Sequence, residues 1–208
     1  MRQFGRMVRN IGMILPMAFA TAADEMDLSD ISTPGCAVSG LAVSPPAPWL
    51  NAQISGLPEQ MSGCQMMRTD DDEHLVGIIR ILSVQTGPGM SADEARERVI
   101  AFESLIWRDI GFEVTDRLWL REDVPVHDRH DEGFSSGSAV GLAAVIQGTQ
   151  LPQEIHVLFF SRLPDNTHYV ISLLTPSGPD ATEIYAHNLE DYSRILNSLT
   201  LTSDGSGE

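Results

Sequence analysis

Residues 75–111 read LVGIIRILSVQTGPGMSADEARERVIAFESLIWRDIG and decide how this chain folds. The segment 75–86 is rich in β-branched and other apolar residues, which predicts a strand buried on one or both faces. Gly87-Pro88-Gly89 ends that strand. Ser91 is a favourable helix N-cap, and Glu94 three residues later completes a capping box. A strand followed directly by a helix is therefore expected.

The predicted helix runs from Ser91 to about Asp109, with Gly111 as the residue that ends it. Its apolar residues recur at helical spacing, so one face of the helix is expected to pack against the strand. These residues are Ala95, Val99, Phe102, Leu105 and Ile106.

Further strands and a closing helix are predicted after this helix. The expected strands are 112–121, 138–147, 154–162 and 167–174, and the closing helix is 180–199. A bulge or turn is expected at Asp116 within the first of these strands. Consecutive antiparallel strands with helices against one face predict the α+β class, an antiparallel meandering sheet packed against helices in a single domain.

Residues 1–22 have the pattern of a secretory signal peptide. Three Arg residues precede the apolar run Ile11 to Phe19, and Ala20-Thr21-Ala22 supplies small residues for cleavage. The run is too short to span about 30 Å of hydrocarbon. An uncleaved N-terminal anchor is the alternative interpretation.

The mature chain is expected to hold one domain. Residues 23–40 are polar and acidic, which predicts a flexible lead-in. The single α+β domain is expected to span 41–201, and a disordered polar tail to occupy 202–208.

The charge balance excludes several classes of function. The chain of 208 residues has 13 basic and 29 acidic side chains, a formal charge of −16, and every basic residue is Arg. Removal of the signal peptide takes away three Arg and no acid, which changes the charge to −19. So acidic a chain is unsuited to nucleic-acid phosphates or to anionic lipid. We expect a periplasmic or secreted protein without a membrane anchor, whose partners are basic or neutral.

The two cysteines, Cys36 and Cys64, both lie in the mature part. An even count in an oxidising compartment predicts one disulfide, worth about 3–4 kcal/mol on the chain-entropy model. A free or catalytic thiol is the alternative, and no C-x-x-C motif is present.

A candidate metal site lies in the loop from His127 to Glu132. His127, His130 and Asp131 are of the residue types that bind zinc and similar divalent ions. Loop spacing does not guarantee that these side chains converge, so a solvated acidic loop without a cofactor is the preferred interpretation.

Other chemistry-bearing patterns have simpler structural interpretations. The acidic run 70–73 followed by His74 lacks EF-hand spacing and predicts a polar turn. His156 and His168 lie on strands, and their imidazoles would face each other if those strands were suitably paired. Gly133-Phe134-Ser135-Ser136-Gly137 matches the letters of a nucleophile elbow, but a strand is predicted where the elbow requires a helix.

Trp107 and Trp119 are candidates for a ligand groove between helix and sheet. Both are slightly out of phase with the nearest core positions of their elements. Burial against another element is the default for such residues, and a pocket between helix and sheet is the alternative.

The order of elements resembles the Mog1/PsbP-like family, including bacterial periplasmic proteins of the DcrB type. The resemblance covers about residues 41–201 and rests on four features: the Pro–Trp entry near Trp49, the strand leading into the Ser91 helix, the meandering strands, and the closing helix with SRILNSL at 193–199. It implies a binding or assembly accessory, and no catalytic residues carry over.

The leading hypothesis is a non-enzymatic periplasmic binding or accessory protein with an acidic surface. One alternative is a metal-dependent periplasmic hydrolase that uses the His127–Glu132 loop. Another is an immunity-type protein that binds a basic partner through its acidic surface.

Overall fold

The computed structural model describes residues 36–54, 57–86, 90–126, 134–162 and 166–201. The elements in chain order are β1 (Cys36–Val38), β2 (Leu41–Val43), β3 (Leu50–Gln53), β4 (Met61–Thr69), β5 (Leu75–Gln85), α2 (Ala92–Asp109), β6 (Phe112–Val124), β7 (Gly137–Ile146), β8 (Pro152–Arg162), β9 (Thr167–Pro176), the 3-10 helix η3 (Pro179–Ala181), α3 (Thr182–Ser198) and β10 (Thr200–Leu201). Within these residues, no helix combines the length and the apolar character needed to cross a membrane.

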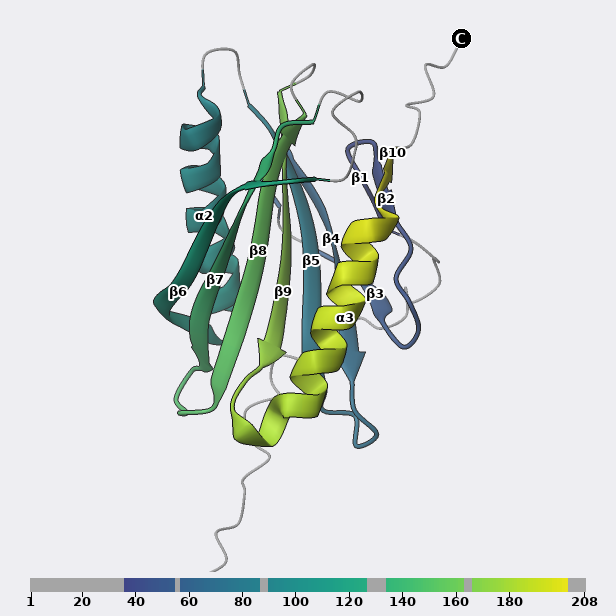
Figure 1. The fold of residues 1–208 in the computed structure, drawn as a ribbon, viewed down its shortest axis with the longest axis vertical. Helices are drawn as coiled ribbons and strands as arrows, with labels where there is room; N and C mark the ends of the chain where they lie inside the picture. Colours follow the sequence, from purple (N-terminus) through teal and green to yellow (C-terminus); the bar gives the residue numbers. More distant parts are fainter. Residues whose placement is uncertain (1–35, 55–56, 87–89, 127–133, 163–165, 202–208) are drawn as a thin grey trace, which may run out of the picture.

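Seven strands form one antiparallel sheet in the order β3-β4-β5-β9-β8-β7-β6, and β1, β2 and β10 form a small second sheet. From β5 the chain passes through α2 to the far edge strand β6. It then returns strand by strand until β9 pairs with β5 (Figure 1). The predicted α+β class with a meandering antiparallel sheet is confirmed.

The two helices lie on opposite faces of the large sheet. Alternate residues of β5 face different cores: Ile79 and Ile81 pack in the core under α3, whereas Ile78 and Leu82 pack in the core under α2. The expectation that both helices cover one face is therefore wrong. Strands β5 and β9 are apolar on both faces, and each face needs its own cover to exclude water.

Helix α2 begins and ends where the sequence predicts. The Ser91 side chain accepts a hydrogen bond from the Glu94 backbone N–H at 3.2 Å, which satisfies a donor of the first turn. After the helix, Gly111 has φ of 96°, a left-handed conformation that glycine adopts without steric cost. These local signals set the first and last residues of the helix without contacts from distant parts of the chain.

Several strands in the first part of the chain were not predicted. Residues 36–40, assigned from sequence to the flexible lead-in, form β1 and its turn, and β1 pairs with β2. Strand β4 also escaped prediction, because MSGCQMMRT mixes small, polar and apolar residues without clear alternation. Of these strands, β2 also pairs with β10, which lies far along the chain and gives the sequence around β2 no local signal.

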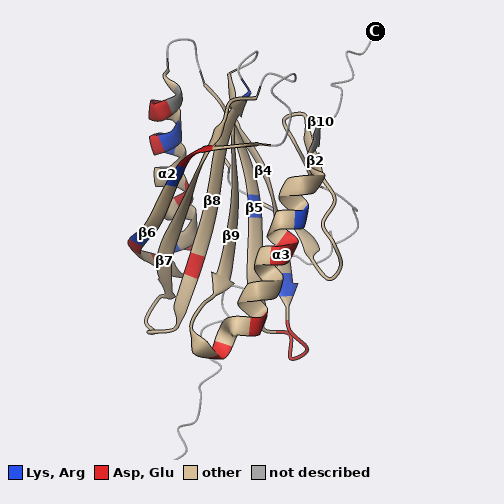
Figure 2. Ribbon diagram, in the orientation of Figure 1, with Lys and Arg blue, Asp and Glu red and all other residues tan. Residues whose placement is uncertain are grey.

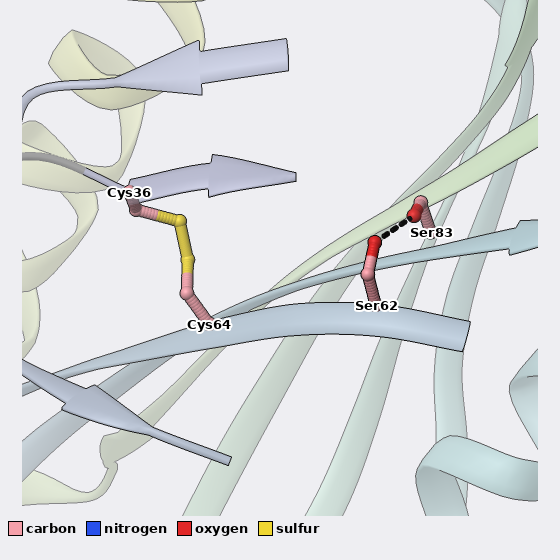
Figure 3. The surroundings of a disulfide bond; sticks show 4 residues. All are labelled: Cys36, Ser62, Cys64 and Ser83. Carbon is pink, nitrogen blue, oxygen red and sulfur yellow. Dashed lines mark hydrogen bonds between the residues drawn. A yellow bond between two sulfur atoms is a disulfide. The ribbon is translucent and has the colours of Figure 1, made fainter. Parts of the chain in front are cut away.

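The predicted disulfide is present between Cys36 on β1 and Cys64 on β4, with Cα atoms 6.1 Å apart and a sequence separation of 28 (Figure 3). Beside it, the hydroxyls of Ser62 and Ser83 are hydrogen bonded at 2.7 Å across β4 and β5. The disulfide therefore joins the small sheet to the large one.

A buried ion pair lies between the sheet and α2. Arg80 on β5 and Glu103 on α2 are 1% and 3% exposed, with Nη1 and Oε2 at 3.0 Å. Arg80 also donates to Gln65 at 2.9 Å, Ser172 donates to Glu103, and the guanidinium lies 4.0 Å from the centre of the Trp107 ring. Each charge thus has several partners, as burial requires.

Replacing both cysteines in a Cys36→Ala, Cys64→Ala double variant should lower the free energy of unfolding by about 3–4 kcal/mol, because the unfolded chain gains loop entropy. Equilibrium unfolding in urea measures this loss. Reduction of the wild-type protein should reproduce it, and an unchanged midpoint in the double variant would contradict a stabilising role.

Glu103→Gln should lower the free energy of unfolding by about 3–5 kcal/mol, because it leaves the buried Arg80 cation without its counter-charge. The double variant Arg80→Met, Glu103→Leu should be more stable than Glu103→Gln, since no charge then remains buried. Thermal and urea unfolding compare the two. A double variant at least as unstable as the single one would refute this account.

Candidate binding groove

Helix α3 leaves part of its sheet face open. The helix packs against β9 and β5, while β6, β7 and the outer part of β8 extend beyond it. We call the resulting hollow, of about 540 Å³, the α3 groove. Its lining residues are Trp119, Val124, Pro125, Val126, Ala139, His156, Val157, Leu158, Tyr192, Ser193, Leu196, Asn197 and Leu199. Its volume is in the range of small-ligand sites.

Small residues of β7 form part of this open face. Ala139, Gly141 and Ala143 lie opposite Leu158, His156 and Glu154 of β8 in the register of the two strands. These three β7 residues carry at most a methyl group, and Ala139 lines the groove, whereas Val145 on the same side is larger.

A register shift in β6 brings Trp119 into the groove. Arg117 opposes Leu142 and Trp119 opposes Gly141, so Leu118 is an extra residue in β6. The Trp119 ring lies so close over Gly141 that a Cβ atom there would collide with it. Another shift between Val114 and Asp116 confirms the predicted bulge.

Beside Trp119, three polar and aromatic side chains contact one another. His156 lies between two rings, with centroids 5.7 Å from Trp119 and 5.9 Å from Tyr185. Tyr185 on α3 donates a hydrogen bond to Glu154 Oε2 at 2.8 Å. His156 Nε2 is 3.3 Å from both the Glu154 carboxylate and the Tyr185 hydroxyl.

This arrangement changes two ionisation equilibria. Burial lowers the pKa of His156 below 6.5, although the Glu154 carboxylate opposes the shift. Burial and then Glu154 raise the pKa of Tyr185 to about 12. Near neutral pH the imidazole is therefore neutral, and the tyrosine keeps the proton that it donates to Glu154.

The predicted Trp residues have different positions. Trp119 is half-buried and lines the α3 groove, whereas Trp107 is fully buried against Phe112 and Arg80 in the core under α2. In the sequence, both Trp residues are slightly out of phase with the nearest core positions of their elements. The difference follows from the elements that pack on them: α2 encloses Trp107, whereas no helix in the described part of the chain covers Trp119.

The predicted metal ligands His127, His130 and Asp131 lie outside the residues that the structure describes. In the described part of the chain, no group of three His, Cys, Asp or Glu side chains is placed to hold a metal ion. The loop begins directly after Val126, which lines the groove.

The remaining candidates have structural roles in the described residues. His168 is hydrogen bonded to Ser161 at 2.7 Å and to Thr86 at 2.9 Å, and the β8–β9 register separates it from His156. Asp70 accepts from the backbone of Asp72 and His74 within the predicted polar turn. Ser135 precedes a strand and not the helix of a nucleophile elbow.

Sequence reasoning missed Glu154 and Tyr185. Glu154 is the only acidic residue in the apolar run of β8, and this was the available signal. Its pairing with Tyr185, which is 31 residues away, depends on the docking of α3.

Comparison with solved structures finds proteins that have a similar fold. The Ran-binding protein Mog1p of Saccharomyces cerevisiae superimposes with a TM-score of 0.50 at 13% identity, covering 78% of this chain and 90% of that chain. A single-substitution mutant of Mog1 matches at 0.48 and 12% identity, covering 79% and 92%. A protein from Bacteroides thetaiotaomicron matches at 0.42 and 12% identity, covering 81% and 47%.

No protein-family model and no curated protein matches the sequence. The likeness to Mog1p confirms the Mog1-like fold that the sequence resemblance predicts. At this identity it shows the fold alone.

The stability of the protein should fall as the pH is lowered from about 7 to about 5, partly through His156. The unfolded chain takes up a proton on this residue below 6.5, whereas burial holds the folded pKa lower, so acid favours unfolding. In His156→Gln this contribution disappears, and the melting temperature should depend less on pH. An unchanged pH dependence in the variant would contradict a buried neutral imidazole.

Proposed function

We propose that this chain is a non-enzymatic binding protein of the periplasm or of the secreted fraction, and that its partner is a protein with a basic surface that enters the α3 groove. The observation that carries this proposal is the groove itself, in which a half-buried Trp119 and apolar side chains stand open beside α3. Grooves of this kind, with few polar groups, are suited to specific binding.

The charge of the chain supports a basic partner. Acidic residues are present on both helices, on the turn between β4 and β5, and on β6 (Figure 2). A protein of charge −19 after signal-peptide removal attracts basic surfaces and repels acidic ones. The fold is compatible with protein binding, because the Mog1p that it resembles is a Ran-binding protein.

The location is inferred from the N-terminal sequence and the cysteines. The basic start, the short apolar run and the small residues up to Ala22 support export. The Cys36–Cys64 disulfide agrees with an oxidising compartment, where such bonds persist.

Site-specific photo-crosslinking in the producing cells tests the groove. A photoreactive amino acid replaces Asn197, an exposed groove residue, and in a matched control it replaces Leu105, which is 45% exposed on α2. We expect a crosslinked partner of discrete mass from position 197 and not from position 105. Adding Trp119→Ala should weaken that crosslink several-fold, because ring burial dominates such contacts.

Three results would contradict the proposal: crosslinks of equal yield at both positions, a crosslink at position 197 that ignores Trp119→Ala, or no crosslink at all. The circular dichroism spectrum and melting temperature of each variant show that the fold is retained. Raising the salt concentration in extracts should reduce the association, as expected for an acidic surface with a basic partner.

A further inference from the structure

The Glu154 carboxylate has an incomplete set of partners. Its side chain is 26% exposed, and Tyr185 donates to Oε2. Within the described residues no Arg comes within ion-pair distance of it, and its ion-pair partner is His156 at 3.3 Å. Because burial lowers the pKa of His156, that imidazole is neutral near pH 7 and supplies no positive charge. A largely buried carboxylate without a cation is costly, and an incoming cation would remove that cost.

Aromatic side chains from different elements form a row that begins at this carboxylate: Tyr185 and His156 contact Glu154, and Trp119 contacts His156. Trp119 comes from β6 and Tyr185 from α3, and His156 lies between them on β8. The faces of such rings attract cations. The chain itself illustrates this, since the Arg121 guanidinium lies 5.6 Å from the centre of the Trp119 ring.

The neighbouring strand leaves room for a ligand. Glu154 lies opposite Ala143 of β7, whose methyl group is too small to cover the carboxylate, whereas the Trp119 ring lies over Gly141 opposite His156. His156 lines the α3 groove of about 540 Å³, and Glu154, which does not line it, lies 3.3 Å behind this imidazole.

We propose that Glu154, together with the rings of Trp119 and Tyr185, binds an arginine side chain of the partner protein. This inference rests on the proposed function and deepens it by naming the group that is recognised. A planar guanidinium fits better than the compact ammonium of lysine, because it stacks on a ring while it donates N–H groups to a carboxylate. The negative charge of the protein brings such a partner to the groove.

Nuclear magnetic resonance on the full mature chain tests this proposal with N-acetylarginine amide as the probe. N-acetylcitrulline amide, which has nearly the same shape without the charge, is the neutral comparison. The Trp119 indole N–H signal should move with the arginine compound, while those of the buried Trp49 and Trp107 stay in place. We expect the arginine compound to bind about tenfold more tightly than the citrulline compound.

Two variants with the same charge change locate the site. Glu154→Gln should weaken binding of the arginine compound by about tenfold, as for loss of a charge-assisted hydrogen bond. Glu183→Gln, at an exposed position on α3, should leave binding nearly unchanged. Melting temperatures of both variants show whether the fold is intact.

The proposal is overturned if the arginine and citrulline compounds bind alike, if both variants lose the same affinity, or if no Trp119 shift appears. Tighter binding of free arginine than of the amide-capped compound would also overturn it, since the site would then serve a free solute. If one of these results occurs while position 197 still crosslinks to a partner, the groove function stands and the arginine site alone fails.

Discussion

The docking of helix α3 on the large sheet is the constraint on which the rest of this face depends. Asn188 is completely buried, and its side-chain amide donates to the Val76 carbonyl at 2.7 Å and to Thr175 at 2.9 Å. Arg68 donates to the oxygen of the same amide at 3.0 Å. Asp191 accepts from the Trp49 indole at 2.9 Å, so the helix is tied to β4, β5, β9 and the segment before β3. These bonds hold α3 over one half of the sheet.

One helix cannot cover seven strands, and among the described residues the part of this face beyond α3 contains the α3 groove. A protein would normally close such a space with large side chains, but β7 presents Ala139, Gly141 and Ala143 there. The extra residue in β6 then turns Trp119 over Gly141. The α3 groove is thus the combined result of helix position, small β7 residues and a bulge in the edge strand.

The opposite face of the sheet, under α2, contains a buried ion pair. Helix α2 encloses the Arg80–Glu103 pair together with Trp107, and the two charged groups of the pair have hydrogen-bond partners within the protein. On the α3 side, the Glu154 side chain is partly exposed, and its ion-pair partner within the described residues is His156. The two carboxylates therefore differ: Glu103 is paired with Arg80 in the core, and the partly exposed Glu154 is the group that we propose binds a cation from outside.

Local signals in the sequence were enough to predict the strand at 75–86, the Ser91 helix start, the bulge at Asp116 and the α+β class, because each depends on neighbouring residues. The disulfide was also predictable, since two cysteines allow only one pairing. Strand β4 was not predicted because its residues lack clear alternation, and β10 pairs with β2, which is far away in the sequence. In the groove, Trp119 was foreseen as a candidate, but its contact with His156 and the Glu154–Tyr185 bond were not.

The sequence by itself therefore determined the charge, the export pattern, the limits of α2 and the cysteine pair, all of which follow from composition or from contacts within a few residues. Only the tertiary structure decided that the helices take opposite faces, that Trp107 is enclosed while Trp119 is open, and that His156 joins Tyr185 instead of His168. The physical reason is that strand register and helix docking are set by many long-range contacts together. A shift of one residue in a strand moves every side chain beyond it to the other face.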